Sequence, residues 1–158
     1  YPLAGADLNA VSIWGAGREG FSGTWPIIWT HQVKAPSAQK FVETFTKRFN
    51  TPPENQGVAD YLAIKILAQS MNTIKTDDTM KVIQYLESGV KFDVLRAREG
   101  YFRPWDHQLM FEMYTVSPNP DPKAGKWDIM TTSAPVPGAD ESLEVLAPSR
   151  QENECKFA

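Results

Sequence analysis

The chain has 158 residues, of which 42% are apolar and 22% charged, and its formal net charge is -3. This composition is typical of one globular domain, and a chain of this length can bury about 70% of its unfolded surface. The single cysteine, Cys155, excludes an internal disulfide and a zinc site built from several cysteines. Basic residues form no cluster, so no nucleic-acid partner is expected, and no apolar run approaches the roughly 20 residues of a membrane-spanning helix.

Residues 1–33 predict one short helix and one strand. Apolar residues three apart predict a helix over residues 7–14 that ends at Gly15. Residues 25–33 predict a buried strand, which begins at or after Pro26 because proline lacks the amide hydrogen that a strand interior needs.

Two helices are predicted between residues 37 and 71. In the first, Phe41, Phe45 and Phe49 recur every fourth residue, Ser37 is the expected N-cap, and Asn50 ends the helix. The second covers residues 58–71 and is richer in apolar side chains, so we expect it to be more deeply buried.

A third helix is predicted from Thr76 to Gly89. A hydroxyl cap followed by two acidic residues suits the positive end of the helix dipole, and glycine commonly ends a helix. The side chains of this helix that we expect to be buried are Met80, Ile83 and Leu86.

The rest of the chain predicts strands followed by an arm. Residues 109–116 predict a strand that is apolar on nearly both faces, and residues 126–130 a short final strand. Because residues 117–158 hold six of the twelve prolines and little periodicity, they predict an extended C-terminal arm. The core is expected to include Phe41, Phe45, Val58, Leu62, Ile66, Leu109 and Phe111.

Asp106 and His107 are neighbours of the kind that could support general base catalysis. Neighbours on a strand point to opposite faces, however, so the two side chains would not contact each other there. The sequence therefore favours a structural turn over a catalytic pair. The glycine-rich segment at 15–20 lacks the preceding strand of a dinucleotide-binding site, and we expect a turn there as well.

Four segments between residues 36 and 116 together resemble a known family. They are, in chain order, PSAQKFVETFTKRFNTPP, VADYLAIKILAQSM, YLESGVKFD and GYFRPWDHQLMFEMYTV. This set is similar to the C-terminal half of the periplasmic solute-binding proteins of branched-chain amino-acid ABC transporters, the leucine/isoleucine/valine-binding family. In that family an aromatic residue opens the second of these helices, here Tyr61, and a Gly, Arg, Asp-His-Gln stretch leads into a strand.

The resemblance implies an α/β fold of the type I periplasmic-binding-protein kind, with two lobes that close over a solute. Residues 1–116 would supply parts of both lobes, with residues 1–50 in one lobe and the helices over 58–88 in the other, and residues 117–158 would form the arm. The fold would be incomplete, because a family member is considerably longer than this chain. The missing N-terminal half, or a second copy of the chain, would then cover an apolar face of those helices.

The function implied by the resemblance is binding without catalysis. A small solute such as an amino acid or an aromatic acid would be captured in the periplasm and delivered to an ABC permease in the inner membrane. The residues expected at the ligand are Asp7 as charge partner, with Trp14 and Tyr61 as stacking walls. Neither a cofactor nor a metal is implied, and Arg103 with Asp106 would form a turn that positions the crossing strand.

Two alternatives stay open at this point. One is a cytosolic ligand sensor of the same fold, and the other is a hydrolase that uses His107 with an acidic partner. A catalytic His107 should face a pocket and bond to a carboxylate, whereas a binding protein would place it near a junction of the lobes.

Overall fold

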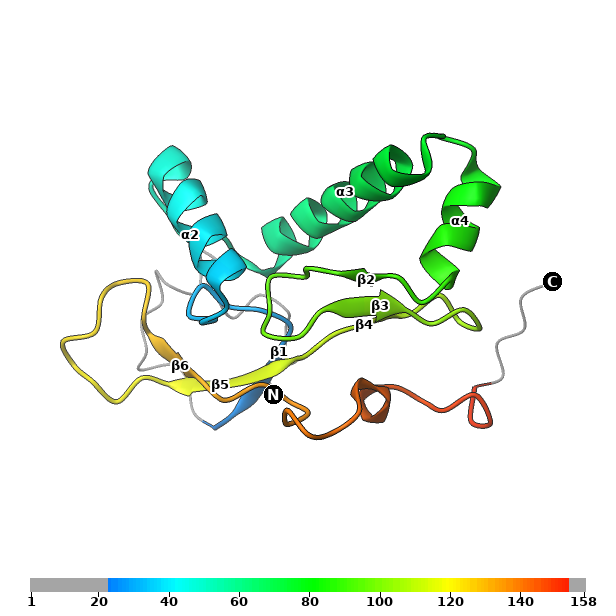
Figure 1. Ribbon diagram of the computed structural model, residues 1–158. Coiled ribbons are helices and arrows are strands. Elements are labelled where there is room, and N and C mark those ends of the chain that lie inside the picture. Colours follow the sequence, from blue (N-terminus) through cyan, green and yellow to red (C-terminus); the bar gives the residue numbers. More distant parts are fainter. Residues whose placement is uncertain (1–22, 154–158) are drawn as a thin grey trace.

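The computed structural model describes residues 23–153. Figure 1 shows the helices on one side of the strands and the C-terminal segment running along the other. The helix expected over residues 7–14 lies outside the described residues. In chain order the elements are β1 (Trp25–Ile27), α2 (Pro36–Phe49), α3 (Asn55–Ile74), α4 (Thr79–Glu87), β2 (Lys91–Phe92), β3 (Gly100–Phe102), β4 (Leu109–Met110), β5 (Tyr114–Pro118), β6 (Met130–Thr132) and the 3-10 helix η2 (Leu143–Leu146).

The strands form two antiparallel sheets of three strands each. In one sheet β5 lies between β1 and β6, with Val116 opposite both Trp25 and Thr132. In the other, β3 lies between β2 and β4. A Cβ atom at Gly100 would lie 2.8 Å from the carbonyl oxygen of Met110, so glycine is needed for this close approach of two backbones.

Trp29 is fully buried and joins the helices to the strands. Its indole Nε1 donates to the carbonyl oxygen of Leu95 at 3.1 Å, and its backbone amide donates to Oδ1 of Asn55, also at 3.1 Å. The ring meets Phe41 edge-on, with 6.3 Å between centroids. Three segments far apart in the sequence therefore meet at one residue.

Arg96 is a buried cation whose charge is met by backbone carbonyl groups. Its guanidinium donates to the carbonyl oxygens of Glu112 at 2.8 Å and Ile28 at 2.6 Å, and it lies over the ring of Phe111 at 4.1 Å. Burial lowers the pKa of Arg96 to about 10, so the side chain is still charged at neutral pH.

The ends of the helices confirm the sequence predictions at two positions and correct them at two others. Asn50 ends α2 in the left-handed conformation, and Gly89, with φ of 79°, follows α4. The expected cap of α2 was wrong, because the hydroxyl of Ser37 donates to Asp93 at 2.9 Å and Ala35 is the N-cap. The cap of α4 is Asp78, which accepts from the amide of Lys81, and the helix begins at residue 79.

The predicted core is partly confirmed. Val58, Leu62 and Ile66 are buried, whereas the other four expected core residues, Phe41, Phe45, Leu109 and Phe111, are half-buried. Met80 was expected to be buried but is 62% exposed. The buried residue of α4 is Val82, and two residues span about 200° around a helix, so Met80 lies on the opposite side.

The strand predictions were too long. The strand expected over 109–116 is divided between two sheets, because the backbone and side chain of Glu112 have other partners. Its buried carboxylate bonds to Nε of Arg98 at 2.9 Å, and its carbonyl oxygen accepts from Arg96. The strand expected over 25–33 ends at residue 27. It also begins at Trp25 instead of at or after Pro26, because β1 is an edge strand, where a proline is tolerated. β6 covers 130–132 instead of 126–130.

The segment after residue 116 is fastened to the rest of the molecule at defined points. Residues 117 and 118 complete β5, and β6 pairs with it. Further along, Arg98 donates to the carbonyl oxygens of Pro137 and Glu141, both at 2.7 Å. Arg103 donates to Oε2 of Glu144 at 3.1 Å and to the carbonyl oxygen of Pro148 at 3.0 Å. The assignment of residues 1–116 to two lobes stays a prediction.

Candidate functional site

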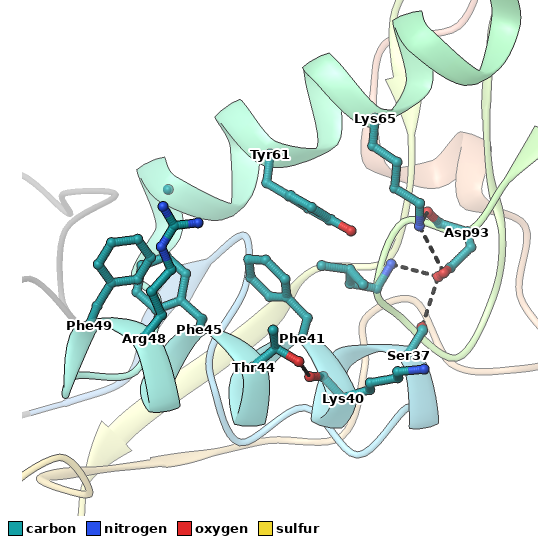
Figure 2. A pocket seen from close by; sticks show the side chains of 12 residues that line it. Ser37, Lys40, Phe41, Thr44, Phe45, Arg48, Phe49, Tyr61, Lys65 and Asp93 are labelled. Carbon is teal, nitrogen blue, oxygen red and sulfur yellow. Dashed lines mark hydrogen bonds and ion pairs between the residues drawn. The ribbon is translucent and has the colours of Figure 1, made fainter. Parts of the chain in front are cut away.

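A cavity of about 520 Å³ lies between α2 and α3, and we call it the α2–α3 cavity (Figure 2). One wall comes from α2, the other from α3, and the loop after β2 closes one end. Its lining residues are Ser37, Lys40, Phe41, Thr44, Phe45, Arg48, Phe49, Gly57, Tyr61, Lys65, Asp93 and Leu95.

Aromatic rings form a continuous row in this cavity. Phe41, Phe45 and Phe49 follow one another on the same face of α2, because residues four apart in a helix are neighbours. Their successive ring centroids are 5.8 and 4.5 Å apart. Tyr61 of α3 completes the row, with its centroid 4.4 Å from that of Phe41. Tyr61 is 42% exposed and Phe49 51%, so the row offers ring surface to a ligand.

At the other end of the cavity, Asp93 is held by several donors, as Figure 2 shows. Its Oδ1 accepts from the hydroxyl of Ser37 and from the amide of Leu95, both at 2.9 Å. Its Oδ2 accepts from Nζ of Lys65 at 3.0 Å. Burial raises the pKa of Asp93, but the hydrogen bonds and the charge of Lys65 together lower it below its ordinary value of 3.8. This carboxylate is therefore ionised and already well supplied with donors.

Positive charge predominates in the lining, where Lys40, Arg48 and Lys65 accompany the single carboxylate of Asp93. Lys65 is paired with that carboxylate. Within residues 23–153, neither Lys40 nor Arg48 forms an ion pair with an acidic side chain. The arrangement can hold a flat apolar group against the rings and an anionic group at its cationic positions.

Of the residues expected at the ligand, Tyr61 lines this cavity, and its contact with a ligand stays a prediction. Asp7 and Trp14 lie outside the described residues. Sequence reasoning missed Arg48 and Lys65 as lining residues. The signal was present in the four-residue spacing from Gly57 through Tyr61 to Lys65, but such spacing is equally typical of a packed helix face.

Asp106 and His107 have different hydrogen-bond partners. Asp106 bonds to the guanidinium of Arg103, whose amide donates to the carbonyl oxygen of Gln108 at 2.9 Å and closes a turn. The expected structural turn is thus confirmed. Nε2 of His107 lies 2.6 Å from Oε1 of Glu87. His107 does not line the α2–α3 cavity, the cavity beside β6 or the groove between α3 and the sheet of β3 and β4.

A second cavity, of about 700 Å³, lies beside β6, and its polar side chains bond mainly to one another. Nε2 of Gln32 donates to Asp128 at 3.0 Å and to the carbonyl oxygen of Met130 at 2.8 Å, while its Oε1 accepts from the amide of Thr132. Nε2 of His31 lies 2.9 Å from the same Asp128 carboxylate. These bonds fasten β6 to the loop after β1, so we assign the residues a structural role.

The third cavity, of about 290 Å³, is an apolar groove between α3 and the sheet that contains β3 and β4. Its lining is aliphatic and aromatic apart from Arg96, whose guanidinium is already bonded to carbonyl groups. Throughout residues 23–153, no three potential metal ligands cluster together, and none of the helices has the length and apolar character needed to span a membrane.

The chain matches a family model described as periplasmic binding protein over residues 1–126. No curated protein matches it significantly. Its fold is similar to the amino acid ABC transporter substrate-binding protein of Pseudomonas fluorescens Pf-5, with a TM-score of 0.69 and 19% identity over 84% of this chain and 34% of the other. It is also similar to a branched chain amino acid ABC transporter periplasmic ligand-binding protein of Burkholderia xenovorans LB400, with a TM-score of 0.67 and 26% identity over 77% and 32%.

A third similar structure is a solute binding protein of an ABC transporter from Rhodopseudomonas palustris BisB5, solved in complex with 3,4-dihydroxybenzoic acid. Its TM-score is 0.58, with 14% identity over 73% of this chain and 30% of the other. At 19% and 14% identity, the Pseudomonas and Rhodopseudomonas proteins show a likeness to this chain in fold alone. The chain spans about a third of the length of these solved structures.

Proposed function

Because the chain belongs to the periplasmic binding protein family, we propose that its α2–α3 cavity binds the solute that the protein captures. Membership of the family confirms the resemblance seen in the sequence, and the structural neighbours confirm an α/β fold of the type I periplasmic-binding-protein kind, of which this chain is a part. A solute-binding role follows from both.

The observation that carries the proposal is the pair of rings from different helices, Phe41 of α2 and Tyr61 of α3, at the wall of an open cavity. Ligand sites are typically concave and lined by aromatic side chains with a few polar groups. The family resemblance assigns these helices to different lobes. A solute that contacts both would then favour the closed arrangement of the lobes, since a ligand stabilises the state that it binds better.

The proposed role is capture without catalysis. The solute would be an amino acid or an aromatic acid, taken up in the periplasm and delivered to an ABC permease in the inner membrane. Family membership supports the compartment and the permease as partner, and the described lining of the cavity supports a small organic solute.

The apolar groove supports a further partner. Its lining leaves aliphatic surface of α3 uncovered, and Leu67 is 44% exposed there. Exposed apolar surface of this kind is typical of an interface. We propose that the rest of the two-lobed fold covers it, or, where only this chain is present, a second copy.

The test is a thermal-shift panel of amino acids and aromatic acids, followed by calorimetric titration of any compound that raises the melting temperature. A ligand at about 100 times its dissociation constant adds roughly 2.7 kcal/mol to the free energy of unfolding. Tyr61→Ala should abolish the shift. Met80→Ala is the matched control, because Met80 is 62% exposed on α4 and lines no part of the cavity. A shift that survives Tyr61→Ala would place the binding site elsewhere.

A further inference from the structure

The charges in the α2–α3 cavity narrow the class of solute, and this step rests on the function proposed above. A free amino acid is a zwitterion, so its site must offer a positive group for the carboxylate and a negative group for the ammonium. Among the described lining residues, the single negative group is Asp93. Its two oxygens already accept from Ser37, Leu95 and Lys65. Oδ2 could accept one more hydrogen bond, but an ammonium group placed there would lie beside the ammonium of Lys65, and the two like charges would repel each other.

Arg48 is the cation best placed to receive an anion. It projects from the last turns of α2 toward the beginning of α3, as Figure 2 shows, and its guanidinium carbon lies 5.2 Å from the ring centroid of Phe49. No acidic side chain of the described chain forms an ion pair with it. A guanidinium presents paired N–H donors that match the two oxygens of a carboxylate, which an ammonium cannot do.

The surroundings of Arg48 suit a carboxylate attached to a ring. Phe45 and Phe49 lie beside it, with their own centroids 4.5 Å apart, and provide an apolar face for the body of the ligand. Gly57, in the first turn of α3, faces the same cavity, and a Cβ atom there would meet no other atom within 4 Å. The space between the two helices is therefore open next to the guanidinium.

We propose that the solute is an aromatic monocarboxylate and that Arg48 binds its carboxylate while the phenylalanine row of α2 binds its ring. Asp93 neutralises Lys65, which leaves Lys40 and Arg48 as the lining cations without an acidic partner in the described chain, and of these two Arg48 has the guanidinium geometry that matches a carboxylate. This assignment differs from the amino-acid site predicted from the sequence, in which Asp7 pairs with an ammonium.

Three aromatic probes test the proposal by calorimetric titration: benzoate, the neutral benzamide of the same size, and the larger zwitterion phenylalanine. Benzoate should bind about tenfold or more tightly than benzamide, because a hydrogen bond to a charged group contributes about 1.5–3 kcal/mol. Benzoate binding should also weaken as salt is added, since exposed charges are screened. Phenylalanine should bind more weakly than benzoate.

Variants of the helix give a matched comparison. Arg48→Gln should weaken the binding of benzoate about tenfold and leave the binding of benzamide unchanged. The affinity of Arg48→Lys for benzoate should lie between those of the unsubstituted chain and Arg48→Gln. Lys47→Gln is the control, because it removes the same charge from the neighbouring residue, which does not line the cavity. Equal effects of Arg48→Gln and Lys47→Gln would overturn the assignment of Arg48.

Two results separate this inference from the proposed function. If phenylalanine binds more tightly than benzoate and both Asp7→Asn and Tyr61→Ala abolish its binding, the solute class is wrong while the cavity keeps its function. If Tyr61→Ala weakens the binding of none of the probes or panel compounds, the proposed site and this inference are both wrong.

Discussion

Two faces of α3 differ sharply in chemistry although they belong to the same helix. One face presents Gly57, Tyr61 and Lys65 to the α2–α3 cavity, and the other presents Val58, Leu62 and Ile66 to the apolar groove. The first face makes directional contacts, such as the ion pair of Lys65 with Asp93 at 3.0 Å. The second contributes apolar burial, which is not directional. One face of the helix is therefore suited to recognition and the other to stability.

A helix that is apolar on several sides is typical of an element buried from more than one direction. In α3, Leu67 of the groove is 44% exposed, and Ile64, which lines neither the α2–α3 cavity nor the groove, is 69% exposed. Substitutions that alter one face at a time test this difference between the two faces, because an effect of the wrong kind on either face would contradict it.

The largest loss of stability is expected for Leu62→Ala, since Leu62 is 5% exposed in the core. The free energy of unfolding should fall by about 2–5 kcal/mol, because the substitution leaves a cavity. Chemical denaturation measures the change. Ile64→Ala on the same helix should change it by about 0.5 kcal/mol or less, as is usual for exposed positions. Similar losses at both positions would mean that Ile64 is covered in solution.

Phe41→Ala should affect both stability and binding, because Phe41 touches Trp29 in the core and Tyr61 in the cavity. Phe41 is half-buried, so we expect a loss of about 2 kcal/mol, below the range for a fully buried phenylalanine. Phe49 is 51% exposed, so Phe49→Ala should lower stability less than Phe41→Ala does. It should weaken the binding of aromatic ligands but not of other ligands. Denaturation and titration of both variants test this order.

Leu67→Glu probes the apolar groove. If a partner surface covers Leu67, a charge there should weaken the association by about 1 kcal/mol, or roughly fivefold in the dissociation constant. Sedimentation velocity of the 17.7 kDa chain measures its self-association. Met80→Glu, on α4 outside the groove, should leave the association unchanged. A well-folded monomer that binds its solute tightly would contradict the need for a cover.

The smallest effect is expected for Asp93→Asn and concerns pH. The pKa of Asp93 is lowered in the folded chain, so its contribution to stability is present above its ordinary pKa of 3.8 and is lost as the pH falls through the folded value. The carboxylate is 44% exposed, and solvent screening limits this contribution to about 0.2–1 kcal/mol. Between pH 6 and a pH below 3, the free energy of unfolding should therefore fall more for the unsubstituted chain than for Asp93→Asn, as chemical denaturation at both pH values would show. Identical pH profiles would show that the ion pair does not stabilise the fold.

Tertiary contacts explain where the predicted site was incomplete. Tyr61, which lines the cavity, was expected at the ligand from the family resemblance, but its partner Phe41 was assigned to the core, because a four-residue aromatic spacing is typical of any packed helix. Lys65 and Asp93 are 28 residues apart, and no local pattern brings them together. Arg48 was interpreted as part of the polar side of α2, which is where such a residue is most often found.

The amino-acid sequence by itself determined the positions of α2 and α3, the helix ends at Asn50 and Gly89, and the family. Those features follow from local rules, since helical periodicity and left-handed end residues need no distant partner. Only the tertiary structure decided where the strand over 109–116 divides, because Glu112 finds Arg98 and Arg96 through space. It also decided which side of α3 faces the cavity, because an apolar pattern specifies that a face is buried without specifying what it is buried against.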